Sequence, residues 1–254
     1  MERLNVRQPA ARAGQPPTAP WLDDASWLRH GAQMTSADRD RAHEPSVWCP
    51  RCGDPIAIDD DGSWACSRHV RVPPLSGFKE PSVFVLLEHA TRTRFGGRFP
   101  TWLPWPLPTL WSVSGVGVVG DQHTVATVLA CSGPDPLGGA GALVVVAEEP
   151  LTGLGAHYAG IAGLEPDVRI FGRVADAKVV VSGHPTPLWH VEAADDRAVY
   201  VGEASGCWLW VVGWPGLATA AVLLEATTLV DLSSITAELD VVPLTGLCPR
   251  LLSP

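Results

Sequence analysis

Three cysteines and one histidine stand at spacings that suit a bound metal ion. Cys49 and Cys52 form a C-x2-C pair, Cys66 and His69 form a C-x2-H pair, and thirteen residues lie between Cys52 and Cys66. Two residues between ligands allow a tight turn that points both side chains at one ion, and two such pairs suit tetrahedral zinc. Gly53 stands where such a turn needs a positive φ. We expect one structural Zn²⁺ per chain, because four protein ligands leave no open coordination position.

The residues between the two pairs can form the hairpin that brings the pairs together. Residues 56–58 and 63–65 are typical of short strands, and the Asp/Gly-rich residues 59–62 supply a turn. This is the layout of a zinc ribbon. A module of about 30 residues has too small a core to fold without its metal. Residues 46–76 are therefore predicted to form a zinc-ribbon module.

Two other interpretations of the cysteine motif remain open. Residues 48–52 (Trp-Cys-Pro-Arg-Cys) resemble the redox pair of thioredoxin-like proteins, which needs a helix that begins at the first cysteine. Gly53 and Pro55 oppose such a helix, and the second pair would then have no role. The motif could also be coincidental, or bind metal through fewer ligands, because its fourth member, His69, is a single histidine and not a cysteine.

The rest of the chain offers weaker candidates for catalysis. His157 or His190 could act as an acid or base, and Cys131 could act as a nucleophile, if the fold places them in a pocket. The competing interpretation is a hydrogen-bonded structural histidine and an inert buried thiol. The glycine pattern at residues 115–120 lies inside a β-rich stretch and runs into a turn, so it predicts a strand and no dinucleotide site.

The net charge of −9 disfavours unspecific binding to nucleic acid, because an acidic chain repels phosphate at long range. If the ribbon did read nucleic acid, Arg51, Arg68 and Arg71 would be its contacts. Six cysteines among 254 residues are too few for a disulfide scaffold, and no secretion signal is visible. The predicted compartment is therefore the cytoplasm.

The elements around the motif predict an α+β protein with three parts. Residues 1–45 are Pro-, Ala- and Arg-rich without a sustained period, which predicts a disordered arm. Residues 77–254 are predicted to form an antiparallel-sheet domain of two meanders, in one sheet or two related halves, with one or two packed helices. The expected strands are 110–119, 124–131, 142–147, 178–182, 187–192, 198–203, 207–212 and 239–242, and the expected helices are 83–93 and 217–230.

Two unusual segments of this domain need an interpretation. Residues 99–108 hold four prolines and two tryptophans, which forbid a helix or a central strand and favour an extended segment packed on the chain's own core. Residues 204–224 carry no charge and are long enough to cross a bilayer. Gly213, Pro215 and Gly216 interrupt that run, so it predicts a buried strand, a turn and a helix, and no membrane span.

Five stretches of the chain together resemble an uncharacterised actinobacterial family, a domain of unknown function with an N-terminal zinc-ribbon-like head. They are Cys-Pro-Arg-Cys-Gly (49–53), Trp-Leu-Pro-Trp-Pro-Leu-Pro (102–108), Cys-Ser-Gly-Pro-Asp-Pro-Leu-Gly-Gly (131–139), Leu-Gly-Ala-His-Tyr-Ala-Gly (154–160), and Val-Gly-Glu-Ala (201–204) with Trp-Leu-Trp (208–210). The resemblance implies a zinc-binding head and a β-rich body, and it supplies no catalytic residue.

These observations favour a cytoplasmic zinc-binding protein that acts as a protein-interaction or regulatory module, with another protein as its partner. An enzyme with a site in the β-rich domain and a nucleic-acid binder are the alternatives.

Overall fold

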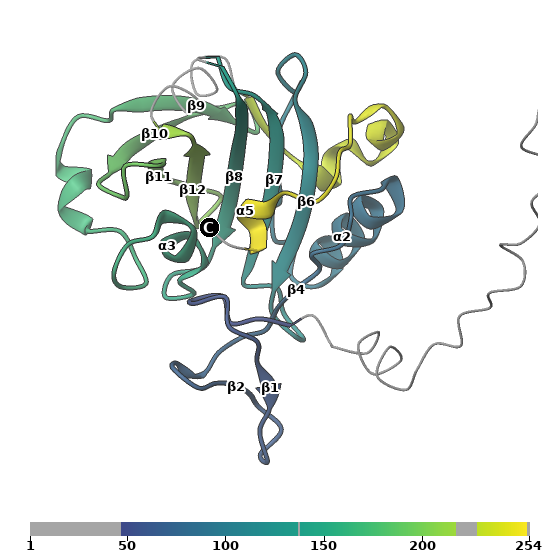
Figure 1. Cartoon of the computed structure of the whole chain (residues 1–254), viewed down its shortest axis with the longest axis vertical. Helices are drawn as coiled ribbons and strands as arrows, with labels where there is room; N and C mark the ends of the chain where they lie inside the picture. The colour runs from purple at the N-terminus through teal and green to yellow at the C-terminus, as the bar shows by residue number, and fades with distance from the viewer. Residues whose placement is uncertain (1–46, 137, 217–227, 253–254) are drawn as a thin grey trace, which may run out of the picture. The chain divides into compact units, whose positions relative to one another are not determined.

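A ten-stranded sheet forms the body of the protein in the computed structural model, which describes residues 47–136, 138–216 and 228–252 (Figure 1). Its strand order is β4-β6-β7-β8-β12-β11-β10-β9-β13-β5, and all neighbours pair antiparallel except β9 and β13. The two predicted meanders form one sheet, joined where β8 pairs with β12. The strands are β4 (Leu75–Ser76), β5 (Trp102–Pro104), β6 (Ser112–Val119), β7 (Ala126–Pro134), β8 (Ala140–Glu148), β9 (Ala177–Val181), β10 (His184–Val191), β11 (Ala198–Ala204), β12 (Cys207–Trp214) and β13 (Thr228–Asp231).

Both faces of this sheet are buried, which explains why its central strands are apolar at nearly every position. Along β8, Leu143 and Val145 belong to one hydrophobic core, whereas Val144 and Val146 belong to a second. Successive side chains of a strand point to opposite faces, so one continuous apolar run serves two cores. The glycine pattern at residues 115–120 lies in β6 and just after it, as predicted for a strand.

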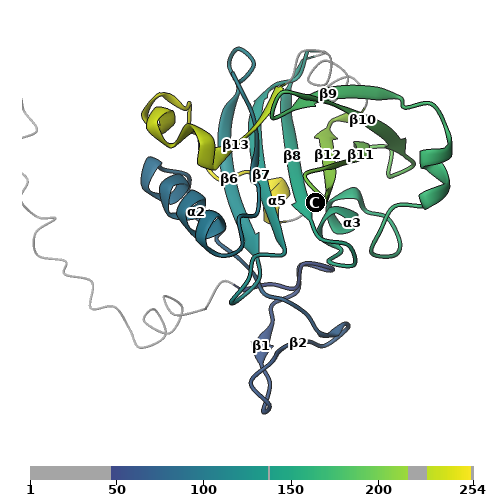
Figure 2. The same cartoon turned by 180° about the vertical axis from the view of Figure 1, so that it is seen from behind.

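The sheet bends at β10 and turns over the first core. Residues 189–191 of β10 pair with β11, and residues 184–188 pair with β9. Beyond the bend, β5 packs across β7 and β8. α2 (Val83–Phe95) and the 3-10 helix η3 (Leu232–Val241) lie side by side and complete this core (Figure 2).

The second core lies on the opposite face of the sheet, beneath three short helical segments: α3 (Leu154–Ala159), η2 (Val168–Gly172) and α5 (Pro249–Leu252). Tyr158 of α3 is fully buried, and its hydroxyl donates to the carbonyl of Leu251 at 3.1 Å. The ring of Trp210 packs so closely against Gly155 that a side chain at position 155 has no room. α3 is thereby fixed onto β12.

The helix at residue 83 and the proline-rich segment after it agree with their predictions. The Ser82 hydroxyl accepts a hydrogen bond from the Val85 N–H at 3.2 Å, and the helix runs two residues past its predicted end. Trp102 and Leu103 are buried in the first core, so this segment packs on the chain's own core as expected. Residues 102–104 also form β5, an edge strand, where proline's missing N–H interrupts no ladder.

Two predictions near the C-terminus are wrong. Residues 228–230 of the predicted helix belong to β13, because Thr228, Leu229 and Val230 lie between β9 and β5 and pair with them. Residues 217–227 of that helix lie outside the described residues. The strand expected at residues 239–242 is instead the end of η3 and the residue after it, and Leu239 is buried in the first core.

The uncharged run at residues 204–216 is ordinary sheet over most of its described length, since β12 occupies residues 207–214. Within residues 47–136, 138–216 and 228–252, no helix is both long enough and apolar enough to cross a membrane.

The residues before β4 form a second, three-stranded sheet, which we call the head (residues 47–74). Its strands are β1 (Ala57–Ile58), β2 (Trp64–Cys66) and β3 (Val70–Arg71), in the order β1-β2-β3. The hairpin turn falls where it was predicted: the Gly62 N–H donates to the Asp59 carbonyl at 2.9 Å. Residues Ser46–Pro254, head and body together, form one compact unit.

Candidate metal centre

Two tight turns position the four candidate ligands. In the first, the Gly53 N–H donates to the Cys49 carbonyl at 2.9 Å, and Gly53 adopts the expected positive φ of 70°. The second turn joins β2 to β3, so that Cys66 ends one strand and His69 precedes the next. The register Cys66↔Val70 holds this turn closed. Each of the two turns therefore presents two of the four candidate ligands, at the open end of the β1–β2 hairpin.

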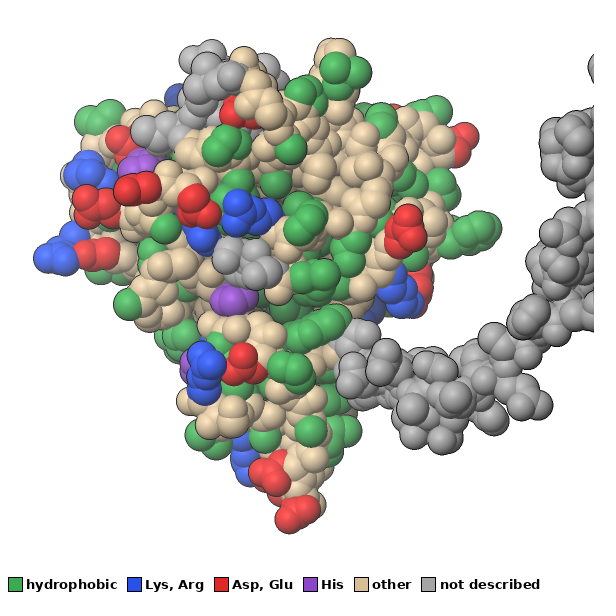
Figure 3. All heavy atoms as spheres, in the orientation of Figure 1, with side chains coloured by type: hydrophobic (Ala, Val, Ile, Leu, Met, Phe, Trp, Pro, Cys, Tyr) green, Lys and Arg blue, Asp and Glu red, His purple; other side chains and the backbone are tan. Residues whose placement is uncertain are grey.

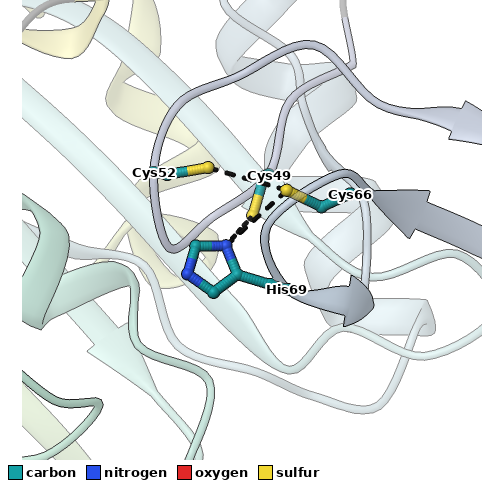
Figure 4. Close-up of side chains that lie close together, drawn as sticks. All are labelled: Cys49, Cys52, Cys66 and His69. Carbon is teal, nitrogen blue, oxygen red and sulfur yellow. Dashed lines mark hydrogen bonds between the residues drawn. The ribbon is translucent and has the colours of Figure 1, made fainter.

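The four side chains point at a common centre (Figure 4). All four ligand atoms lie within 4.8 Å of one another. The Cys52 and Cys66 sulfurs are 3.7 Å apart, and the His69 Nδ1 lies 3.5 Å from the Cys49 sulfur and 3.6 Å from the Cys66 sulfur. Tetrahedral zinc, with bonds of ~2.3 Å to sulfur and ~2.0 Å to nitrogen, separates two sulfurs by about 3.8 Å and sulfur from nitrogen by about 3.5 Å. The arrangement can hold a metal ion, and the three separations given above are close to those in a zinc tetrahedron.

The protonation of the three thiols also fits a cation site. Burial raises the pKa of Cys49, and burial raises the pKa of Cys52 to about 12. Burial opposes ionisation of Cys66 too, but the Arg68 backbone N–H and the His69 imidazole outweigh it and lower the Cys66 pKa to about 6. Only one of the three thiols would therefore ionise at neutral pH without a cation. A divalent ion would supply the charge that three neighbouring thiolates need.

The head has little else to stabilise it. Its buried apolar side chains are Cys49, Ile56, Cys66 and Val72, and two of these four are ligands. Ile58 and Val70 are largely exposed. So small a core does not offset the loss of chain entropy, so interactions outside this core must contribute to the stability of the head.

The first turn of the metal site is bound directly to the body. Arg51, between the two cysteines, donates from Nε to the Thr152 carbonyl at 3.2 Å and from Nη2 to the Leu151 carbonyl at 3.0 Å. Gly53 lies against His157 of α3, where a Cβ would come within 3.2 Å of Nε2. The metal-binding turn thus packs on the β8–α3 connection and on α3.

The entrance and exit of the head are fixed as well. Trp48 and Leu75 exchange two backbone hydrogen bonds of 2.8 and 2.9 Å. The Trp48 ring packs against Phe78, with 5.4 Å between ring centroids. The head is therefore joined to the edge of the large sheet through backbone and side chain.

The candidate catalytic residues lie apart from one another. Cys131 is buried in the first core, and burial raises its pKa far above the ordinary range. His157 is on α3, at the opposite face of the sheet, where burial and the nearby Arg197 lower its pKa to about 4. His190 packs edge-on against Tyr200. His157 lines a hollow of about 80 Å³, shared with Trp48 and Phe78 among others, which is smaller than a typical substrate site.

The arginines proposed as nucleic-acid contacts all have partners within the protein. Arg51 binds the two carbonyls described above. Arg68 pairs with Asp54 at 3.1 Å, and Arg71 pairs with Asp61. Arg51 is thus held against the body, whereas the Arg68 and Arg71 pairs lie on the surface of the head.

Sequence reasoning missed one buried polar group near the head. Glu148, the last residue of β8, is fully buried and accepts a hydrogen bond from the Leu154 N–H at 2.7 Å, which holds the start of α3. Its other oxygen has no hydrogen-bond partner among the described residues, although the Trp210 indole lies nearby. The sequence signal that could have revealed it is an acidic residue at the end of an apolar strand.

The chain belongs to a family of unknown function, DUF6758, whose model matches residues 43–251. No curated protein and no solved structure matches the chain. The family covers both the head and the body, in agreement with the resemblance to a domain of unknown function seen in the sequence.

Proposed function

We propose that Cys49, Cys52, Cys66 and His69 bind one structural Zn²⁺ and that residues 46–76, which include the head, form a zinc-ribbon module. The observation that carries this proposal is the agreement of three measured ligand separations with a zinc tetrahedron. Three soft thiolates and one imidazole suit zinc better than the hard cations Mg²⁺ or Ca²⁺. Four protein ligands leave no position for a substrate, so the metal stabilises structure and activates no water.

We further propose that the zinc site fixes the head against the antiparallel-sheet domain, which was predicted to span residues 77–254. Arg51 lies between two ligands, and Gly53 follows the second. A metal that holds this turn also holds the two arginine hydrogen bonds and the contact with His157. Loss of the metal would release the turn and these contacts together.

At the level of the whole protein, we propose a cytoplasmic protein-interaction or regulatory module. The closed metal site and the exposed apolar side chains of α2 support it. The enzymatic alternative has less support, because Cys131, His157 and His190 occupy different parts of the fold. The nucleic-acid alternative has less support because Arg51, Arg68 and Arg71 already have partners.

Metal analysis of the purified full chain tests the zinc proposal. We expect about one zinc per chain, and an X-ray absorption spectrum that fits three sulfur ligands and one nitrogen ligand. Cys66→Ser should lose most of the zinc. Cys207→Ser, which removes a buried thiol of β12 outside the site, should keep it. A reconstituted chain without zinc, or a Cys66→Ser variant with unchanged zinc content, would contradict the proposal.

A further inference from the structure

The outer face of α2 exposes large apolar side chains that the fold does not use. Phe84 and Phe95 are 83% and 80% exposed, and Leu87 is 44% exposed. The whole chain has five phenylalanines, so two of them lie on the surface of one 13-residue helix. Scattered exposed leucines are ordinary, but two largely exposed phenylalanines, one near each end of the same helix, mark a candidate contact surface. The space-filling view shows hydrophobic side chains projecting on the side of the molecule where α2 and η3 lie (Figure 3).

The exposed side chains form one stripe along a helix whose other face is anchored. Phe84, Leu87, Thr91 and Phe95 follow the three- and four-residue spacing that keeps positions on one helix face. On the opposite face, Leu86 and Ala90 are buried in the first core. His89 is also buried and makes a 2.8 Å hydrogen bond to the Thr101 hydroxyl, so the stripe is presented by a fixed element.

The charges beside the stripe are divided between the two ends of the helix. Glu88 lies in its first half, whereas Arg92 and Arg94 lie in its last turns. An antiparallel second helix of the same sequence therefore meets acid with base, whereas a parallel one meets like charges. A two-fold axis between residues 89 and 90 would place Phe84 opposite Phe95 of the second copy and Glu88 beside Arg92 of the second copy.

Both groups of the Glu88–Arg92 cross-pair already have partners within their own chain, and Arg92 uses two of its five N–H donors for them. Arg92 is held in place by hydrogen bonds to the Ser76 hydroxyl at 3.2 Å and to the Gly120 carbonyl at 2.9 Å. Glu88 pairs with Lys79 at 3.4 Å, but both side chains are more than 60% exposed, so this pair contributes little and can be exchanged.

We propose that this α2 face binds a second copy of the chain in an antiparallel, two-fold contact. This proposal rests on the protein-interaction role proposed above, and it specifies a second copy of the chain as the partner. Four phenylalanine rings at about 150–250 Å² each, with their neighbours, bury on the order of 1,000 Å² in total, the low end for a specific interface. An interface of this size is typical of weak association, so we expect the dimer to dissociate in the micromolar range.

Sedimentation of the zinc-loaded full chain between 2 and 200 µM tests the dimer. The expected result is a monomer at the low concentration and a dimer at the high one. Phe84→Ser should raise the Kd about tenfold or more, because it removes two of the four rings buried in the dimer. Val174→Ser, which alters a 91% exposed side chain elsewhere, should leave the Kd unchanged. A chain that stays monomeric at 200 µM, or equal Kd values for the two variants, overturns the proposal.

Cross-linking tests the orientation. Under mild oxidation, a mixture of Phe84→Cys and Phe95→Cys chains should form a disulfide-linked dimer, whereas neither variant alone should. A dimer from Phe84→Cys alone indicates a parallel contact and overturns the proposal. The outcome is separable from the zinc proposal, because a monomer with one zinc per chain refutes the dimer and leaves the metal site intact.

Discussion

Glu148 gives the sharpest quantitative prediction about stability. Burial raises its pKa from an ordinary 4.5 to about 7, against the lowering effect of the backbone N–H groups at the start of α3. The folded protein therefore keeps this proton at pH values where the unfolded chain has lost it. Because the pKa of Glu148 is higher in the folded state than in the unfolded chain, its burial has no cost below about pH 4.5, where both states are protonated. As pH rises from 4.5 toward 7, the unfolded chain loses this proton first, so the free energy of unfolding falls.

The size of the effect follows from the same two pKa values. A tenfold difference in proton affinity is worth about 1.4 kcal/mol, so the full penalty above pH 7 is about 3 kcal/mol. Glu148→Gln replaces the acid with a neutral group of the same shape. The difference in free energy of unfolding, variant minus unmodified protein, should therefore be about 2.5 kcal/mol larger at pH 8 than at pH 5.

Chemical denaturation of both proteins at each pH measures this difference. Effects of pH on the zinc ligands cancel, because both proteins carry the same head. Glu149→Gln is the matched control, since it removes the same charge from the exposed next residue. Parallel pH profiles for Glu148→Gln and the unmodified protein would refute the reasoning. They would mean that Glu148 is ionised in the folded state, with the Trp210 indole and the N–H groups of α3 stabilising the anion.

The head supplies three further predictions. Gly53→Ala should destabilise the head by about 1 kcal/mol more than Gly62→Ala, because both glycines have positive φ but only a Cβ at position 53 meets His157. Equal losses in zinc-release titrations would contradict that contact. Arg51→Ala should lower the melting temperature of the head more than Arg68→Ala, because only Arg51 binds the body; a larger effect of Arg68→Ala would contradict it. Chelation of zinc should make three of the six thiols reactive toward Ellman's reagent; six reactive thiols would show that the body unfolds with the head.

The sequence predicted best those features that depend on residues close together in the chain. The four ligands fall within residues 49–69, so spacing alone brought them together, and Gly53 and the hairpin turn appear as expected. The strands of both meanders follow from apolar runs separated by short turns. These local signals do not require knowledge of which distant segments meet.

The incorrect predictions concern residues whose structure depends on contacts with distant parts of the chain. Leu229 pairs with Pro104 and Val181, and no local signal at residues 228–230 distinguishes that strand from the end of a helix. Three of the four residues at 239–242 are apolar, which suits a short strand, yet the capping carboxylate of Asp231 starts η3, which extends into this run. Glu148 was missed because its role depends on α3 folding back over β8.

The paired backbone hydrogen bonds between Trp48 and Leu75 have a consequence for modularity. They hold the two ends of residues 49–74 side by side, as the closing pair of a β-hairpin does. The head is therefore, in topological terms, one long loop at the rim of the large sheet. A two-residue Asn-Gly turn could in principle bridge the same gap. The head could be excised or exchanged for another insert at this junction without rerouting any strand of the body.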